Sequence, residues 1–133
     1  MSLKNISTSI IVQNSLNQFL LQLRDNKKGL RYSGMWGTIG GGLLGTENIK
    51  KGALRELKEE TGINYVSNLI YIEKKIDLYK NHKPQIIHFF YCRINSNTKL
   101  KCYEGQMLKY FKKSEAIKQN IPKIVYQILI KLK

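Results

Sequence analysis

The sequence is poor in cysteine and proline and contains no long apolar run. Its two cysteines, Cys92 and Cys102, do not follow a zinc-ligand spacing with the two histidines, so no soft-metal site is expected. Two prolines and 42% hydrophobic residues among 133 positions exclude a collagen-like repeat and a disordered chain. No stretch reaches the roughly 20 apolar residues of a membrane span, and no apolar block with a cleavage site follows the N-terminus. We therefore expect one cytoplasmic domain over residues 1–133, without a membrane partner.

Negative charge is also scarce, and it is unevenly distributed. Nine acidic residues stand against 23 lysines and arginines, which gives a formal net charge of +14 and favours polyanionic partners such as nucleotides or nucleic acid. The lysines are scattered, so most of them are expected on a solvated surface. Four acidic residues lie close together in the sequence: Glu47, Glu56, Glu59 and Glu60. This concentration in a basic protein indicates that the carboxylates hold a cation.

Local patterns predict an α/β protein in which helices pack on a sheet. Apolar and β-branched runs indicate strands over 7–12, 18–23, 65–78, 84–94 and 107–111, and the third and fourth of these are expected to form an antiparallel hairpin. Helices are predicted over 49–61, from Ser114 to 119, and from Pro122 onward. Asn48 is suited to cap the first helix and Gly62 to end it. Segment 25–35 is predicted as a loop, and the glycine-rich segment 37–42 as irregular chain.

One face of the predicted helix 49–61 is acidic. At 100° per residue, Glu56, Glu59 and Glu60 fall within about a third of the circumference. Clustered carboxylates repel one another unless a cation intervenes, and oxygen ligands select hard ions such as Mg²⁺ or Mn²⁺. The alternative is a solvated acidic face. Gly52 projects onto the same face, where we expect it to leave room for metal or phosphate.

These residues resemble the signature of the Nudix hydrolases, the MutT-like enzymes. The pattern runs from Gly41 through Glu47 to an Arg-Glu-aliphatic-x-Glu-Glu-x-Gly-aliphatic segment that ends at Ile63, and every specified position is filled. Weaker similarity extends to Leu20–Arg24 before the signature and to Glu104–Gln106 after it. The resemblance implies a Nudix fold, which is a mixed β-sheet sandwiched between α-helices.

The resemblance also implies an activity and a set of site residues. The expected reaction is Mg²⁺-dependent attack of water on the diphosphate linkage of a nucleoside diphosphate joined to another group. By resemblance, the metal ligands are the carbonyl of Gly40 and the side chains of Glu56, Glu59, Glu60 and Glu104. The same resemblance assigns catalytic roles to Glu56, Glu59 and Glu104, with Glu56 and Glu104 both candidates for the general base. Arg55 is expected to orient the glutamates, and Glu47 to support them near the start of the helix.

The sequence indicates the substrate less directly than it indicates the reaction. Four basic residues precede the metal helix in a loop that is expected to close over phosphates: Arg24, Lys27, Lys28 and Arg31. By resemblance, Arg24 matches a position that contacts substrate in some relatives. Of these residues Arg24 is favoured as functional, whereas a solvated surface is the favoured interpretation for the loop lysines. A small nucleotide, such as a nucleoside triphosphate or a nucleotide sugar, is the favoured substrate. An RNA 5′-end pyrophosphohydrolase and a non-catalytic nucleotide- or RNA-binding module are the alternatives, and a homodimer stays open.

Overall fold

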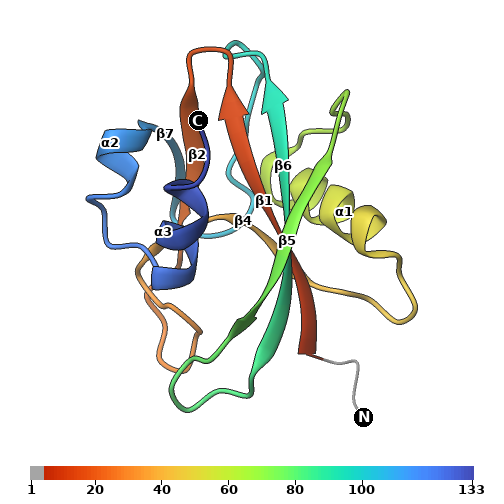
Figure 1. Cartoon of the computed structure of the whole chain (residues 1–133), viewed down its shortest axis with the longest axis vertical. Helices are drawn as coiled ribbons and strands as arrows, with labels where there is room; N and C mark the ends of the chain where they lie inside the picture. Colours follow the sequence, from red (N-terminus) through yellow and green to blue (C-terminus); the bar gives the residue numbers. More distant parts are fainter. Residues whose placement is uncertain (1–4) are drawn as a thin grey trace.

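The computed structural model describes residues 5–133 and shows one seven-stranded sheet with helices on its two faces (Figure 1). The strands are β1 (Ile6–Asn14), β2 (Gln18–Leu23), β3 (Trp36–Gly37), β4 (Ile39–Gly42), β5 (Ile70–Asp77), β6 (Gln85–Ile94) and β7 (Met107–Lys112). Their order is β3-β2-β1-β6-β5, and in addition β4 pairs with β1 and β7 pairs with β2. β1 runs parallel to β6, whereas the other pairings are antiparallel.

The central strand β1 divides the core into two layers. Successive side chains of a strand point to opposite faces, so Ile10 and Val12 contribute to one apolar cluster and Ile11 to the other. The first cluster packs under helix α1 (Ile49–Thr61), which contributes Leu57. The second packs under helix α3 (Lys123–Leu129), which contributes Ile128. Figure 1 shows α1 and α3 on opposite sides of the sheet.

Helix α1 begins and ends where the sequence predicts. The side chain of Asn48 accepts hydrogen bonds from the backbone N–H groups of Lys50 and Lys51, and these would otherwise lack a partner in the first turn. Gly62 ends the helix with φ of +81°, a left-handed conformation that favours glycine. The prediction of helix 49–61 is confirmed, and the acidic side chains are therefore held on a rigid element.

Strand β5 is an edge of the sheet. It pairs only with β6 among the residues that the structure describes, and the two form the predicted antiparallel hairpin. The strand begins at Ile70 instead of position 65, because residues 65–69 connect α1 to the sheet without regular structure. Ile70 and Ile76 are exposed on this edge.

Two further local predictions were wrong. The glycine-rich segment is not irregular, because Gly40 and Gly41 lie in β4 and pair with β1. A Cβ atom at Gly40 would overlap the carbonyl oxygen of Thr8, so the absence of a side chain permits this close strand approach. The short helix α2 (Lys113–Ala116) begins before Ser114, and its first turn is capped by the Glu115 carboxylate, which accepts from the backbone N–H of Lys112 at 2.9 Å.

No helix in the described range 5–133 has the length and apolar character that crossing a membrane requires.

Candidate metal and nucleotide site

Three glutamates from two parts of the chain form an acidic cluster. Glu56 and Glu60 lie on α1, and Glu104 lies in the segment before β7; one carboxylate oxygen from each falls within 4.8 Å of the others. Glu104 reaches this position because its segment is tied to the end of α1. The backbone N–H of Tyr103 donates to the carbonyl of Glu60 at 3.2 Å, and that of Lys101 donates to the carbonyl of Thr61 at 3.1 Å.

Glu60 is the buried member of the acidic cluster. Its side chain is 2% exposed, and one carboxylate oxygen accepts a hydrogen bond from Gln22 Nε2 at 3.2 Å. The other oxygen is buried and has no hydrogen-bond partner within residues 5–133. Burial, reinforced by the neighbouring Glu56 and Glu104, raises the pKa of Glu60 well above its ordinary value. An orphaned carboxylate oxygen beside two further carboxylates fits a hard divalent cation such as Mg²⁺ or Mn²⁺.

The guanidinium of Arg55 is hydrogen-bonded to three glutamates, one of which belongs to the acidic cluster. Its Nε donates to Glu47 Oε2 at 2.7 Å, while Nη1 donates to Glu56 Oε1 at 3.0 Å and to Glu59 Oε1 at 2.9 Å. The hydrogen bonds from Arg55 lower the pKa of Glu47, and the glutamates in turn raise the pKa of Arg55. Glu59, which was predicted as a metal ligand, is half exposed and lies outside the acidic cluster. In the structure its carboxylate is hydrogen-bonded to Arg55 instead.

Glycines bring β4 against the acidic cluster. A Cβ atom at Gly41 would lie 2.6 Å from Glu56 Oε1, which shows that the carboxylate rests directly on the strand backbone. Gly40, the predicted carbonyl ligand, follows Ile39 in the same strand and lines the adjoining cavity. The coordination by its carbonyl stays a prediction.

Gly52 has a different role from the expected one. A Cβ atom there would overlap the side chain of Leu43 and approach Glu47 Oε1 to 3.1 Å. The missing side chain therefore makes room for packing between the loop and the helix. The prediction that Gly52 leaves space for metal or phosphate was wrong, because its neighbours are residues of the protein.

A cavity of about 340 Å³ opens beside the acidic cluster and will be called the cluster cavity. Gly41 and Glu104 line the end that meets the cluster. Along the wall lie hydroxyl groups from Ser7, Ser9 and Thr38, apolar groups that include Ile87, Phe89 and Ile124, and the side chains of Arg24 and Arg31. A cavity with an apolar wall, a few polar groups and an acidic end that can hold a divalent cation is suited to a nucleoside that carries phosphates, because the cation offsets the repulsion between carboxylates and phosphates.

Of the predicted substrate residues, the structure brings two into the cavity wall. Arg24 lines the cavity, and its Nε donates to the carbonyl of Arg31 at 2.8 Å. Arg31 also lines it, although its guanidinium is already bound to Asp77 at 2.8 Å and to the carbonyl of Lys83 at 2.6 Å. Lys27 lies outside the cavity, on an exposed stretch where it is 3.9 Å from Asp25.

Arg31, Tyr32 and Asp77 form what we call the loop latch. Asp77 is 4% exposed, and its second carboxylate oxygen accepts from the Tyr32 hydroxyl at 2.5 Å. Burial and the neighbouring carboxylate raise the pKa of Tyr32, so its hydroxyl stays a donor. The latch ties loop 25–35 to the β5–β6 hairpin.

A family model described as NUDIX domain matches residues 3–129. The chain belongs to the Nudix family. This assignment confirms the prediction of a Nudix hydrolase, an enzyme acting on phosphoanhydride bonds. None of the curated proteins matches the chain.

Solved structures confirm the Nudix fold. The MutT protein from Methanosarcina mazei Go1 is 22% identical, with 98% of this chain and 95% of that chain covered and a TM-score of 0.83. A C. elegans Ap4A hydrolase, solved as a binary complex, is 21% identical over 95% of this chain and 93% of that one, with a TM-score of 0.78. An E. coli dihydroneopterin triphosphate pyrophosphohydrolase is 15% identical, with 97% of this chain and 94% of that chain covered and a TM-score of 0.79.

In this Nudix protein, sequence reasoning missed Gln22 and Asp77. The Nε2 of Gln22 donates to Glu60 Oε1 and, at 2.9 Å, to the carbonyl of Glu104, so one amide joins two members of the acidic cluster. A glutamine that interrupts the apolar residues 19–23 of β2 was an available signal. Asp77, an acid at the end of a strand in a chain with few acids, was another.

Proposed function

We propose that this Nudix hydrolase is a Mg²⁺-dependent pyrophosphohydrolase that cleaves the diphosphate linkage of a nucleoside triphosphate or a nucleotide sugar. The observation that carries the proposal is the acidic cluster, with its orphaned Glu60 oxygen, beside the cluster cavity. The similar solved structures include an Ap4A hydrolase and a dihydroneopterin triphosphate pyrophosphohydrolase; the first supports a nucleotide substrate, and the second supports pyrophosphohydrolase activity.

The acidic cluster would hold the metal through Glu56, Glu60 and Glu104, with the Gly40 carbonyl and Glu59 as additional ligands. When bound, a divalent cation supplies positive charge that neutralises and polarises the diphosphate. Arg55 fixes Glu56 and Glu59 through its hydrogen bonds, and Glu47 fixes Arg55 in turn. These contacts hold the carboxylates in place before substrate arrives.

Side chains at the cavity would bind the substrate and accept the proton of the attacking water. The apolar wall, which includes Phe89, would receive the nucleobase, and Arg24, which lines the same cavity, would bind a phosphate. A carboxylate oxygen of Glu104 or Glu56 accepts the proton of the attacking water. The water oxygen bonds to phosphorus, the bridging P–O bond breaks, and two phosphorylated products leave.

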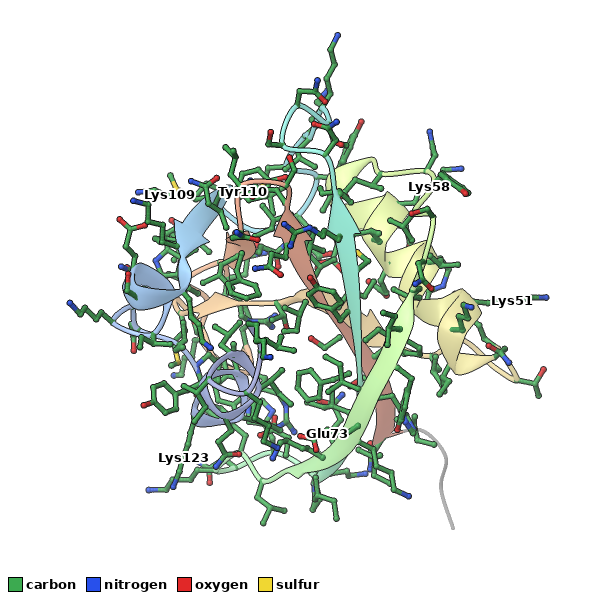
Figure 2. All side chains as sticks on the ribbon, turned by 45° about the horizontal axis from the view of Figure 1, so that its top comes forward. Lys51, Lys58, Glu73, Lys109, Tyr110 and Lys123 are labelled. Atoms are coloured by element: carbon green, nitrogen blue, oxygen red, sulfur yellow. The ribbon has the colours of Figure 1, made fainter. Side chains whose placement is uncertain are left out.

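Hydrolysis of a panel of nucleoside triphosphates and nucleotide sugars, with Mg²⁺ and with chelator, tests the proposal. We expect Mg²⁺-dependent turnover that falls by roughly 10²-fold or more in Glu60→Gln and in Glu104→Gln. Glu73→Gln is the control, because Glu73 lies on β5, away from the acidic cluster (Figure 2). Its carboxylate pairs with Lys131 at 2.9 Å. Turnover that survives both cluster substitutions, or that ignores the chelator, contradicts the proposal.

The net charge of +14 also favours a second candidate, hydrolysis at the 5′ end of RNA. An RNA substrate makes many phosphate contacts, so its binding should weaken steeply with salt. Comparing triphosphorylated RNA with a nucleoside triphosphate at low and high salt separates the two candidates. The third possibility, a non-catalytic binding module, requires that no member of the panel be hydrolysed.

A further inference from the structure

A second hollow is formed by loop 25–35 and the turn that joins β5 to β6, and we call it the basic hollow. Its volume is about 640 Å³, and three lysines line it: Lys27 and Lys28 from the loop, and Lys80 from the turn. None of the described residues that line it is acidic. It shares no lining residue with the cluster cavity, so it is treated as a separate space.

The two walls of the basic hollow are fixed relative to each other. Arg31 of the loop latch donates to Asp77 at 2.8 Å and to the carbonyl of Lys83 at 2.6 Å, so it binds the chain before and after the turn. The turn itself is closed by the backbone N–H of His82, which donates to the carbonyl of Tyr79 at 3.0 Å. The lysines of the loop are therefore held beside the lysine of the turn.

The positive charge of the basic hollow is largely uncompensated. Lys28 and Lys80 form no ion pair in the described part of the chain, and Lys27 has only Asp25, at 3.9 Å. Like charges held in one hollow repel one another, and a bound anion would relieve that repulsion. The argument is the converse of the one that places a cation at the acidic cluster.

The ring of Tyr79 is already in contact with other groups of the protein. Its centroid lies 4.3 Å from that of Tyr32 and 5.1 Å from that of His82, and the Arg31 guanidinium carbon lies 5.7 Å from it. A ring with these neighbours is not free to stack on a nucleobase. The remaining polar groups of the wall are side chains that can donate hydrogen bonds to an anion: Asn26, Ser33 and Asn81.

We propose that the basic hollow binds a free oligophosphate anion, such as inorganic pyrophosphate or tripolyphosphate, at a site that takes no part in hydrolysis. Lysine ammonium groups from both walls match the several charges of such an anion, and the amide and hydroxyl groups donate to its oxygens. The anion joins the loop to the turn as a second tie beside the loop latch. Its binding requires no divalent cation, in contrast to binding of a phosphate at the acidic cluster.

Equilibrium dialysis of pyrophosphate in EDTA tests the proposal, because without a cation the acidic cluster repels anions. We expect Kd to rise about tenfold in the Lys28→Gln/Lys80→Gln double variant, which lacks two charged donors. Lys51→Gln/Lys58→Gln is the matched control, because it removes the same charge from the outer face of α1 (Figure 2). Equal weakening in the two variants, which unspecific attraction to a basic protein predicts, or no binding by the wild type, overturns the proposal.

Amide NMR signals locate the bound anion. On titration with pyrophosphate in EDTA, the signals of Gly29 and Asn81, which line the basic hollow, should shift with the Kd found by dialysis. The signals of Gly41 and Glu104, which line the cluster cavity, should stay in place. Shifts confined to the second pair would put the anion in the cluster cavity and overturn the proposal.

A comparison of phosphate sources identifies the ligand. In EDTA, tripolyphosphate should bind at least as tightly as a nucleoside triphosphate, because the hollow offers no free ring for a base. A nucleoside triphosphate that binds tenfold more tightly through the same two lysines would make the ligand a nucleotide and contradict the proposal. So would a single-stranded oligonucleotide without a terminal phosphate whose binding, unlike that of pyrophosphate, is lost in the hollow variant. The outcome does not depend on hydrolysis, so a failure of the proposed function leaves this test intact.

Discussion

Glu56 lies where it does because position 41 has no side chain. Its carboxylate rests against the backbone of β4, and Arg55 holds it from the other side. A ligand with both contacts in place keeps its direction without bound metal, which reduces the conformational entropy that binding must remove.

Replacing Gly41 with alanine tests this support. The added Cβ would lie within 2.8 Å of both Glu56 carboxylate oxygens, so the carboxylate must move out of the acidic cluster. We expect Mg²⁺ affinity, measured by calorimetry, to fall by about tenfold or more. Gly42→Ala is the control, because a Cβ there meets nothing within 4 Å. Equal affinities in the two variants would show that Glu56 does not depend on the glycine.

Glu60 makes the stability of the metal-free protein depend on pH. Its pKa is raised in the folded state, so the folded chain holds a proton that the unfolded chain releases. The stabilisation is complete below the unfolded pKa of about 4.5 and is lost as pH rises through the folded value. In EDTA, the free energy of unfolding should therefore decline from pH 5 to pH 8, by at most about 1.4 kcal/mol per pH unit for this proton.

Urea unfolding of wild type and Glu60→Gln across this pH range checks the expectation. The glutamine stays neutral, so the slope attributable to position 60 should disappear, whereas Mg²⁺ should restore wild-type stability at pH 8. Identical slopes in both proteins would assign the pH dependence to other groups.

At the residue scale, local geometry predicts part of the site. The shared helix face of Glu56 and Glu60 follows from 100° per residue, but the distance of Glu104 from them depends on how the segment before β7 folds back on α1. Gln22 and Asp77 were missed for the same reason, since their partners lie 38 and 46 residues away. No local pattern specifies such a pairing.

At the element scale, the helix caps and the β5–β6 hairpin were predictable from local sequence, whereas the pairing of β4 with β1 was not. Asn48 and Gly62 act through neighbours within a few residues, so the bounds of α1 followed from the sequence. β4 exists because β1 lies alongside it, and glycine has little strand propensity of its own. Likewise, the need for glycine at position 52 is explained only by a tertiary contact, because the side chain of Leu43 occupies the space that a Cβ atom would fill.

Enlarging position 52 should therefore damage packing first. Gly52→Leu would crowd Leu43 and the Glu47–Arg55 pair, and we expect it to lower the free energy of unfolding by about 1–3 kcal/mol. Leu43→Ala in the same chain should recover part of that loss. Urea denaturation of the single and double variants measures both effects. A stable Gly52→Leu protein that fails only in metal binding would restore the original interpretation of this glycine.

At the scale of the whole molecule, the loop latch joins segments that are far apart in sequence. Asp77→Ala leaves the largely buried Arg31 guanidinium without its carboxylate, so we expect a loss of about 3 kcal/mol in the free energy of unfolding. Tyr32→Phe removes one hydrogen bond and should cost about 1 kcal/mol. Chemical denaturation ranks the two, and a larger loss in Tyr32→Phe would contradict the assigned importance of the ion pair.

The open edge at β5 bears on how the protein behaves in concentrated solution. Its unpaired backbone groups and the exposed Ile70 and Ile76 offer a template on which another chain can add a strand. Lys74 and Lys75 lie between them, and every approaching copy carries the same excess of positive charge. Mutual repulsion would then keep the molecules dispersed, and high ionic strength, which screens it, should favour their self-association.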